Sequence, residues 1–536
     1  MMRVLLVEPQ YRRSGTQIED ASGSEDVGVV SPKTVATQRN EDTLWYPPLG
    51  LMKLARFHKQ RGDEVVFVRG CNRKVAMAVD AVQGKGMWDR VYITTLFTFH
   101  WDTIVETIMF YKEAVGGTAG KIFVGGIMAS MMPDDLFDET GIYPVTGIVN
   151  TPSQIGLEGK EEIDSLPPDY TILDGRQYAI NDTFYAYTSR GCVNKCGWCG
   201  VPRIEPAYQK YIDIKPIIRG LRDNYGDKPK LKLMDNNVLA SDQLEKIIDD
   251  LVELGYGRGQ FTENKPKRNR VVDFNQGLDA SFLDDARMSL LAKLNIKPMR
   301  IAFDRAIERD TYVKALRVAK KHGVQEFSNY MLYNWKDTPR DLYERLVVNI
   351  EMNEEWGKGK TGQAEAEIYS YPMRFAPINN ELGTNANRKR DVFSAVVDNN
   401  RNWLKAAVWT PRFVRNIEIM KGAAHGCISP TPTLAWRTIG RTYEEFLANL
   451  YMPEELLRNR NKHEKHVYQK EPKRESGSGK VEAFRLFISG LLKLNDHRFQ
   501  VFHAAVSGNS AEQIRRALEK CKDKEIKEWL NIYLKK

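Results

Sequence analysis

The sequence has no long apolar run and few cysteines. No stretch reaches the roughly 18 uninterrupted apolar residues that a membrane-spanning helix needs, and the opening MMRVLLVEPQYRR has no secretory cleavage site. The chain has six cysteines in 536 residues, and Cys71, Cys427 and Cys521 lie far from one another. This pattern excludes the dense framework of a secreted disulfide protein. We therefore expect a cytoplasmic protein that does not associate with a membrane.

Histidine is scarce and the charge is only moderately basic. The chain has eight histidines, and none lies between His100 and His322. Lysine and arginine number 79 against 70 acidic residues, a formal net charge of +9. This surplus permits an anionic partner such as a nucleic acid without requiring one. Because the length exceeds what a single core usually organises, two or three domains are expected.

The first 150 residues alternate short aliphatic runs with amphipathic stretches. The runs are MRVLLVEP, EVVFVRG, DRVYITTLF and KIFVGGIMAS. This alternation predicts an open parallel α/β sheet of Rossmann type, with residues 12–44 as an exposed polar insertion. Ligands bind such sheets beyond the carboxyl ends of the strands. The expected binding edge therefore comprises 9–11, 94–97 and 125–126.

The rest of the chain is predicted to form a second α/β domain and a helical region. Residues 151–182, which include DSLPPDYTILD, are expected to be a connector. Six strand and helix pairs over 183–382 predict a partial (β/α)6 barrel with functional groups at the strand ends. A mostly helical region follows, divided into an extension (383–457), a charged flexible linker (458–480) and a small helical module (481–536). The linker carries eight Lys or Arg against three Glu; a solvated tether is favoured over a nucleic-acid or protein dock.

Three cysteines lie within eight residues in the segment YTSRGCVNKCGWCG. Cys192, Cys196 and Cys199 have the spacing C-x3-C-x2-C. Such a loop can hold three irons of a 4Fe-4S cluster and leave the fourth iron without a protein ligand. Structural zinc needs four ligands, and no fourth cysteine or histidine lies nearby. The spacing favours an iron-sulfur cluster, with zinc or a redox dithiol as the alternatives.

This segment resembles the signature of radical S-adenosylmethionine (radical SAM) enzymes. Cys192, Cys196 and Cys199 follow the first expected barrel strand, and aromatic Trp198 precedes the last cysteine. The resemblance implies that SAM chelates the open iron and that one electron cleaves it to a 5′-deoxyadenosyl radical, which abstracts hydrogen from the substrate. It also implies an electron donor such as flavodoxin or ferredoxin.

The resemblance extends to polar residues after the later barrel strands. In the family these positions help to hold SAM, and the usual Gly-Gly-Glu after the second strand is replaced here by Met234-Asp235-Asn236-Asn237. Taken with Trp198, which is expected near the adenine, the implied SAM contacts are Asp235, Asn236, Asn275, Gln276, Asp304 and Arg305. Asn, Asp and Gly are also ordinary turn and capping residues, so each position has a structural alternative.

The domain order resembles the subgroup of radical SAM enzymes with an N-terminal cobalamin-binding domain. The segments WYPPLGLMKLARFHKQRGDEVVFV and IFVGGIMAS carry this resemblance, whereas the Asp-x-His-x-x-Gly motif of one cobalamin class does not occur in residues 1–150. The residues implied as cobalamin contacts are Gln10, Thr95, Leu96, His100, Gly125 and Gly126. His58, on an expected helix, is interpreted as a surface residue.

Three functional hypotheses follow. The first is a radical SAM transferase that binds cobalamin and methylates an unactivated carbon. The second is a cobalamin-independent radical SAM enzyme that rearranges or cyclises its substrate, or modifies a nucleic acid or peptide. The third is a metal-binding protein in which the thiols hold zinc and the chain interacts with nucleic acid. The substrate stays open between peptide, nucleic acid and small metabolite.

Two further sets of residues each have a functional and a structural interpretation. Cys427, beside His425, is a candidate catalytic residue as a radical quencher or covalent acceptor, although a buried structural thiol is commoner. Tyr369, Tyr371 and Phe375, around the last expected barrel strand, either line a substrate cavity or belong to the core.

Overall fold

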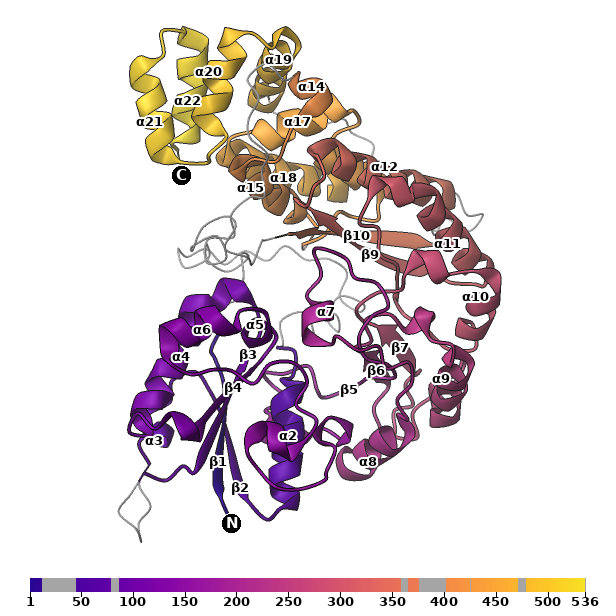
Figure 1. The fold of residues 1–536 in the computed structure, drawn as a ribbon. Coiled ribbons are helices and arrows are strands. Elements are labelled where there is room, and N and C mark those ends of the chain that lie inside the picture. The colour runs from indigo at the N-terminus through magenta and orange to yellow at the C-terminus, as the bar shows by residue number, and fades with distance from the viewer. Residues whose placement is uncertain are drawn as a thin grey trace. The chain divides into compact units, whose positions relative to one another are not determined.

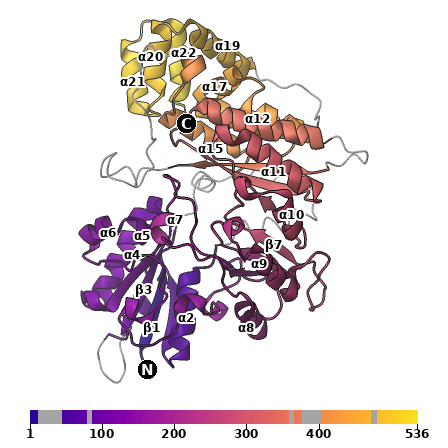
Figure 2. The ribbon, with the colours of Figure 1, turned by 45° about the vertical axis from the view of Figure 1, so that its right-hand side comes forward.

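The computed structural model describes residues 1–11, 45–78, 86–357, 365–375, 402–424, 426–470 and 479–535. The chain divides into two compact units. The first contains the described residues of Met1–Gln276 together with Leu290–Ile296. The second contains Gly277–Ser289 and the described residues from Lys297 onward. Figures 1 and 2 show the elements of both units in two views.

The first unit begins with a parallel sheet. Within the described ranges, this sheet has four strands in the order β2-β1-β3-β4. They are β1 (Arg3–Glu8), β2 (Glu64–Arg69), β3 (Arg90–Thr95) and β4 (Ile122–Gly126). The parallel α/β sheet expected for this region is thus confirmed. Its strand order reverses between β1 and β3, which is where ligands bind in sheets of this kind.

Helices cover both faces of this sheet (Figure 1). They are α2 (Leu49–Gln60), α3 (Arg73–Ala76), α4 (Trp101–Ala114), α5 (Ile127–Met131) and α6 (Pro133–Thr140). Side chains alternate between the faces of a strand, so Leu5 and Val7 of β1 join one core with α4, and Val4 and Leu6 join another with α2. Both faces are therefore buried, which explains the unbroken aliphatic run in the sequence.

His58 is buried inside the second of these cores, and its prediction as a surface residue is wrong. Its side chain has no exposed area. Nδ1 lies 2.8 Å from Asp63 Oδ2, and Nε2 lies 3.0 Å from the hydroxyl of Tyr92. His58 continues the stripe of Leu51 and Leu54 at helical spacing, so it faces the sheet. Burial lowers the pKa of this imidazole.

Each unit also contains one sheet from the region predicted to be a barrel. Among the described residues of the first unit, β5 (Thr183–Ala186), β6 (Lys230–Leu233) and β7 (Val271–Phe274) pair in parallel in the order β5-β6-β7. In the second unit, β8 (Met299–Arg300), β9 (Glu326–Tyr333) and β10 (Glu367–Arg374) pair in parallel in the order β10-β9-β8. All six expected strands are present, and their closure into a barrel stays a prediction.

Helices follow the strands of both sheets. In the first unit they are α7 (Val201–Ile204), α8 (Lys215–Tyr225) and α9 (Leu244–Leu251). Helix α10 (Asp285–Leu291) follows β7, and α11 (Arg309–Lys321) and α12 (Pro339–Trp356) follow β8 and β9. No helix in the described ranges combines the length and apolarity needed to cross a membrane.

The C-terminal part of the second unit is helical. Its helices are α14 (Trp403–Ala406), α15 (Pro411–Lys421), α16 (Pro432–Ile439), α17 (Tyr443–Tyr451), α18 (Glu454–Lys470), α19 (Gly479–Leu494), α20 (His497–Val506), α21 (Ala511–Lys520) and α22 (Lys524–Tyr533). The flexible linker predicted for 458–480 is wrong for 458–470, which belong to α18. Arg460 explains the difference because it is buried and donates to Thr438 O and Asn449 Oδ1. Residues 471–478 lie outside the described part of the chain.

Candidate functional site

The three-cysteine loop leaves the carboxyl end of β5. Arg190 and Gln209 bridge across its base through two backbone hydrogen bonds of 2.9 Å. Gly191 follows with φ +70°, and a Cβ there would lie 2.4 Å from Ala207 O, so the turn into the loop requires glycine. Cys192 and Cys196 are half-buried and Cys199 is exposed. All six cysteines of the chain are described, and none forms a disulfide.

Two hydrogen-bond donors lie near the sulfur of Cys192. The backbone N–H of Asn194 lies 3.3 Å from Sγ, and Nδ2 of Asn237, beyond the end of β6, lies 3.6 Å from it. Both donors could also hydrogen-bond a thiolate sulfur, the form of cysteine that binds iron. The donor set thus fits a thiolate-ligated cluster. As they stand, however, no three His, Cys, Asp or Glu side chains of the described residues are grouped closely enough to hold a metal ion.

Asp235 hydrogen-bonds the end of β6 to the start of the cysteine loop. It is almost fully buried. Its Oδ1 accepts from the Thr188 hydroxyl and the Ser189 hydroxyl, both at 2.7 Å, and the Thr188 N–H lies 3.0 and 3.1 Å from its two oxygens. Burial raises the pKa of this carboxyl, and the hydrogen bonds oppose that rise. Asp235 therefore holds the strand end in place, and its implied contact with the SAM amino group stays a prediction.

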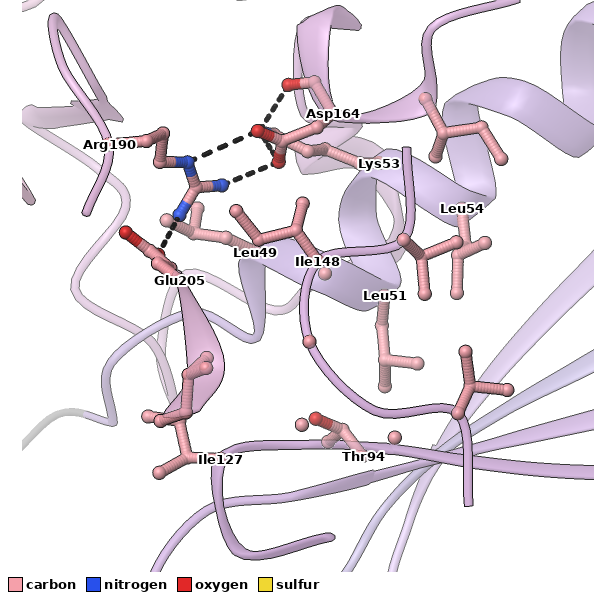
Figure 3. Close-up of a pocket in the computed structure, with 18 of the residues that line it drawn as sticks. Leu49, Leu51, Lys53, Leu54, Thr94, Ile127, Ile148, Asp164, Arg190 and Glu205 are labelled. Atoms are coloured by element: carbon pink, nitrogen blue, oxygen red, sulfur yellow. Dashed lines mark hydrogen bonds and ion pairs between the residues drawn. The ribbon is translucent and has the colours of Figure 1, made fainter. Parts of the chain in front are cut away.

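A network of four charges lies beside the loop (Figure 3), in which Lys53 and Arg190 are buried and Asp164 and Glu205 are partly buried. Arg190 donates from Nε and Nη2 to Asp164 at 3.1 and 2.5 Å, and from Nη1 to Glu205 at 2.7 Å. Asp164 also accepts from Lys53 Nζ at 2.7 Å. Burial raises the pKa of the Asp164 carboxyl, but Lys53 and Arg190 together hold it below its usual value. The network joins α2, the connector and the cysteine loop.

The same charges line a cavity of about 450 Å³ within the first unit. Figure 3 shows Lys53, Asp164, Arg190 and Glu205 along one side of it, with Thr94 opposite. Its other walls are mostly apolar and come from α2, from the ends of β3 and β4 and from the segment 145–149, and Asn236 and Gln276 also reach it. The volume lies within the roughly 300–1,000 Å³ range of small-molecule sites.

The structure separates the implied cobalamin contacts into two groups. Gly125 and Gly126 line the cavity. Gly126 has φ +106°, and a Cβ there would lie 2.3 Å from Thr95 O, so only glycine fits. Gln10, Thr95, Leu96 and His100 are not among the described lining residues. The Thr95 hydroxyl donates to Gly125 O at 3.0 Å, and the His100 ring stacks on Tyr11 at 4.7 Å.

The implied SAM contacts are divided between the two units. In the first unit, half-buried Trp198 lies on the cysteine loop, Asn275 accepts from the Tyr46 hydroxyl at 3.2 Å, and Asn236 donates to Glu205 at 2.8 Å. In the second unit, Asp304 accepts from the Leu332 N–H at 2.9 Å, and Arg305 pairs with Glu308. Their role toward SAM stays a prediction.

A buried arginine organises the strand ends of the second unit. Arg345 of α12 has no exposed side-chain area and donates to Phe303 O, Leu332 O and Asp337 Oδ2 at 2.8–3.0 Å. Burial raises the pKa of Asp337 to about 6, even with Arg345 beside it. No sequence pattern distinguishes Arg345, because an arginine in a polar helix resembles any surface residue.

Cys427 is buried in the second unit, and its thiol donates to Ala424 O at 3.0 Å. Its neighbour His425 lies outside the described residues. The hydroxyl of Tyr369 donates to Glu367 at 3.1 Å, the Tyr371 ring lies 6.1 Å from that of Tyr330, and Phe375 packs on Trp335. These contacts account for the four side chains structurally, and a catalytic role for Cys427 stays a prediction.

Fold and site together define an α/β protein with a three-cysteine loop at the carboxyl edge of a parallel sheet. Comparison with protein-family models and with curated proteins finds no match. Solved structures that are similar include SuiB of Streptococcus suis bound to the precursor peptide SuiA (14% identity, TM-score 0.26, covering 36% of this chain and 39% of SuiB) and SuiB bound to S-adenosylmethionine (14%, 0.25, 37% and 40%). A third is HydG, a maturase of the [FeFe]-hydrogenase (13%, 0.28, 66% and 81%).

These likenesses are too weak to assign a family. The match spans about two fifths of the length of SuiB. All three TM-scores lie below 0.3 and all identities are at most 14%.

Proposed function

We propose that the chain is a radical SAM enzyme whose cluster ligands are Cys192, Cys196 and Cys199. The observation that carries the proposal is the placement of a C-x3-C-x2-C loop directly after β5, with two hydrogen-bond donors at the sulfur of Cys192. When bound, a 4Fe-4S cluster supplies the electron that cleaves SAM to a 5′-deoxyadenosyl radical. The protein's own residues position the loop, offer polar groups to SAM and exclude water.

The residues proposed to meet SAM are polar groups at successive strand ends. Asn236 and Gln276 follow β6 and β7 and line the cavity beside the loop. Amide groups can both donate and accept, so they suit the ammonium and carboxylate of the methionine part. Asp235, Asn275, Trp198, Asp304 and Arg305 complete the proposed set. A small redox protein such as flavodoxin or ferredoxin is the proposed electron donor.

The cavity supports a role for cobalamin. Its mostly apolar walls suit a weakly polar macrocycle, and Gly125 and Gly126 leave its sheet edge without side chains. A whole cobalamin is larger than the cavity, so only part of it would be enclosed there. No histidine is among the described lining residues, so the protein would bind cobalt without an imidazole from this wall. With cobalamin the reaction is methylation of an unactivated carbon; without it, rearrangement or cyclisation is the alternative.

Anaerobic reconstitution tests the main proposal. The full chain, supplied with iron and sulfide, is expected to bind about four irons, to absorb broadly near 400 nm and, after reduction with dithionite, to convert SAM to 5′-deoxyadenosine. Iron analysis, absorbance and liquid chromatography measure the three outcomes. One equivalent of zinc without iron uptake would contradict the proposal and support the alternative of a zinc protein that interacts with nucleic acid.

A bulky residue in the cavity tests the cobalamin proposal. Thr94→Trp is expected to weaken the binding of hydroxocobalamin at least tenfold, because an indole occupies much of the space beside Gly125. Absorbance of the corrinoid that elutes with the protein in gel filtration gives the bound fraction. Tyr143→Trp, at a position 60% exposed, is the matched control and should bind as wild type. Equal binding by the Thr94 variant would place the corrinoid outside this cavity, and no binding by the wild type would favour the cobalamin-independent reactions.

A further inference from the structure

One carboxylate gathers three donors at the base of the cysteine loop. Glu205 Oε2 accepts from the Gly191 N–H at 2.6 Å and from Asn236 Nδ2 at 2.8 Å, and Oε1 accepts from Arg190 Nη1 at 2.7 Å. Only 9% of the side chain is exposed. Both oxygens therefore accept hydrogen bonds, Oε1 from a residue after β5 and Oε2 from residues after β5 and β6.

These donors are next to the groups that surround Cys192. Gly191 directly precedes Cys192, so its N–H determines how the chain enters the loop. Asn236 directly precedes Asn237, whose amide lies 3.6 Å from the sulfur of Cys192. Glu205 thus holds the backbone before the cysteine and the strand end that donates to its sulfur.

Arg190 keeps the Glu205 carboxylate in this position. Its guanidinium lies 3.5 Å from the centre of the Tyr187 ring and bridges Glu205 to Asp164, which Lys53 also binds. The network contains two cations and two anions, so it is neutral as a whole. Replacing one buried charge leaves its partner uncompensated and forces the network to rearrange.

We propose that Glu205 is a positioning residue that sets the geometry of Cys192, with Arg190 orienting its carboxylate. The inference rests on the proposed function, since it treats Cys192 as a cluster ligand. An ion pair with a purely stabilising role would affect the whole first unit alike, whereas a positioning residue acts on the loop specifically. Loop mobility in the protein without its cluster and the properties of the loaded cluster are therefore both informative.

Glu205→Gln tests the proposal because it replaces one acceptor oxygen by an NH2 donor. In either orientation of the amide this NH2 faces another donor, which is Arg190 in one case and the Gly191 and Asn236 groups in the other. Asp227→Asn is the matched control. Asp227 is equally buried and pairs with Arg270 at 2.6 Å, but at the amino ends of the strands β6 and β7. Both variants lose a buried acid in the same unit, and only one of these acids touches the loop.

Hydrogen exchange followed by mass spectrometry provides the first readout, in the full chain without cluster. Residues 187–199 are expected to exchange at least tenfold faster in the Glu205 variant and at the wild-type rate in the Asp227 variant. After reconstitution, the Glu205 variant is expected to show a changed electron paramagnetic resonance spectrum of the reduced cluster and at least tenfold weaker SAM binding. Wild-type exchange in the Glu205 variant, or the same changes in both variants, would overturn the proposal.

Arg190→Lys decides the question if the Glu205 variant does not fold. A single ammonium keeps the charge but cannot bridge Asp164 and Glu205 with the geometry of a guanidinium. We expect faster exchange of 187–199 here too, and wild-type exchange would overturn the proposal. A wild-type protein that takes up no iron would instead contradict the proposed function, which the exchange measurement does not require.

Discussion

Replacing Cys192 by alanine is expected to abolish both cluster binding and SAM cleavage. Three thiolates are the minimum that holds a cubane with one open iron, so two cannot retain it. Iron is expected to fall from about four to below one per chain, and 5′-deoxyadenosine to below the limit of detection. The rate is expected to fall at least 10³-fold, because the variant would lack the cluster that supplies the electron for SAM cleavage.

Cys521→Ala is the matched control for this substitution. Cys521 is also a cysteine that forms no disulfide, but it lies after α21 in the second unit. Its replacement is expected to leave iron content and SAM cleavage at the wild-type level. If the Cys192 variant kept four irons, or if the control lost them equally, the assignment of the loop as the cluster site would be wrong.

Replacing Asp235, at the end of β6, by alanine is expected to destabilise the first unit strongly. The Thr188 N–H and the hydroxyls of Thr188 and Ser189 would lose their acceptor in a buried position. Each buried donor left without a partner costs about 1–3 kcal/mol. We expect the free energy of unfolding to fall by about 3 kcal/mol and the yield of cluster to fall with it. Urea denaturation and iron analysis measure the two effects.

The conservative variant Asp235→Asn separates two roles of this residue. If Asp235 holds the strand end in place, the variant should lose stability and iron together, because the new amide NH2 faces the donors of Thr188 and Ser189. As a direct SAM contact, it should keep full iron and stability and lose only SAM affinity. The second pattern would contradict the fastening role drawn from the hydrogen bonds.

Local sequence patterns were sufficient for the strands and for the cysteine loop. The aliphatic run of β1 predicts a strand buried on both faces, because alternate side chains must meet apolar helices on either side. The cysteine motif limits which metal group the loop could bind, because it offers three thiolate ligands and no fourth. Polar residues after each strand were identified because they break an apolar run. In each case the pattern that gives the prediction spans only a few residues of sequence.

Some local patterns were misleading because burial depends on the whole fold. His58 is a polar residue of the kind found on exposed helix surfaces, but Asp63 and Tyr92 lie within hydrogen-bond distance of its two ring nitrogens inside the core. Residues 458–470 read as a charged linker, but the guanidinium of Arg460 finds buried acceptors. Charge and polarity predict exposure only where no partner is available.

The sequence by itself predicted which residues would hold a cluster, and only the tertiary structure decided what holds those residues in place. One ion pair of the charged network, between Lys53 and Asp164, joins residues 111 positions apart. No periodic pattern in the sequence links these two residues to Arg190 and Glu205. Buried charges require partners, and these partners meet only when α2, the connector and the cysteine loop come together in the folded chain. The cavity has the same origin, since its walls come from segments that meet only in the folded chain.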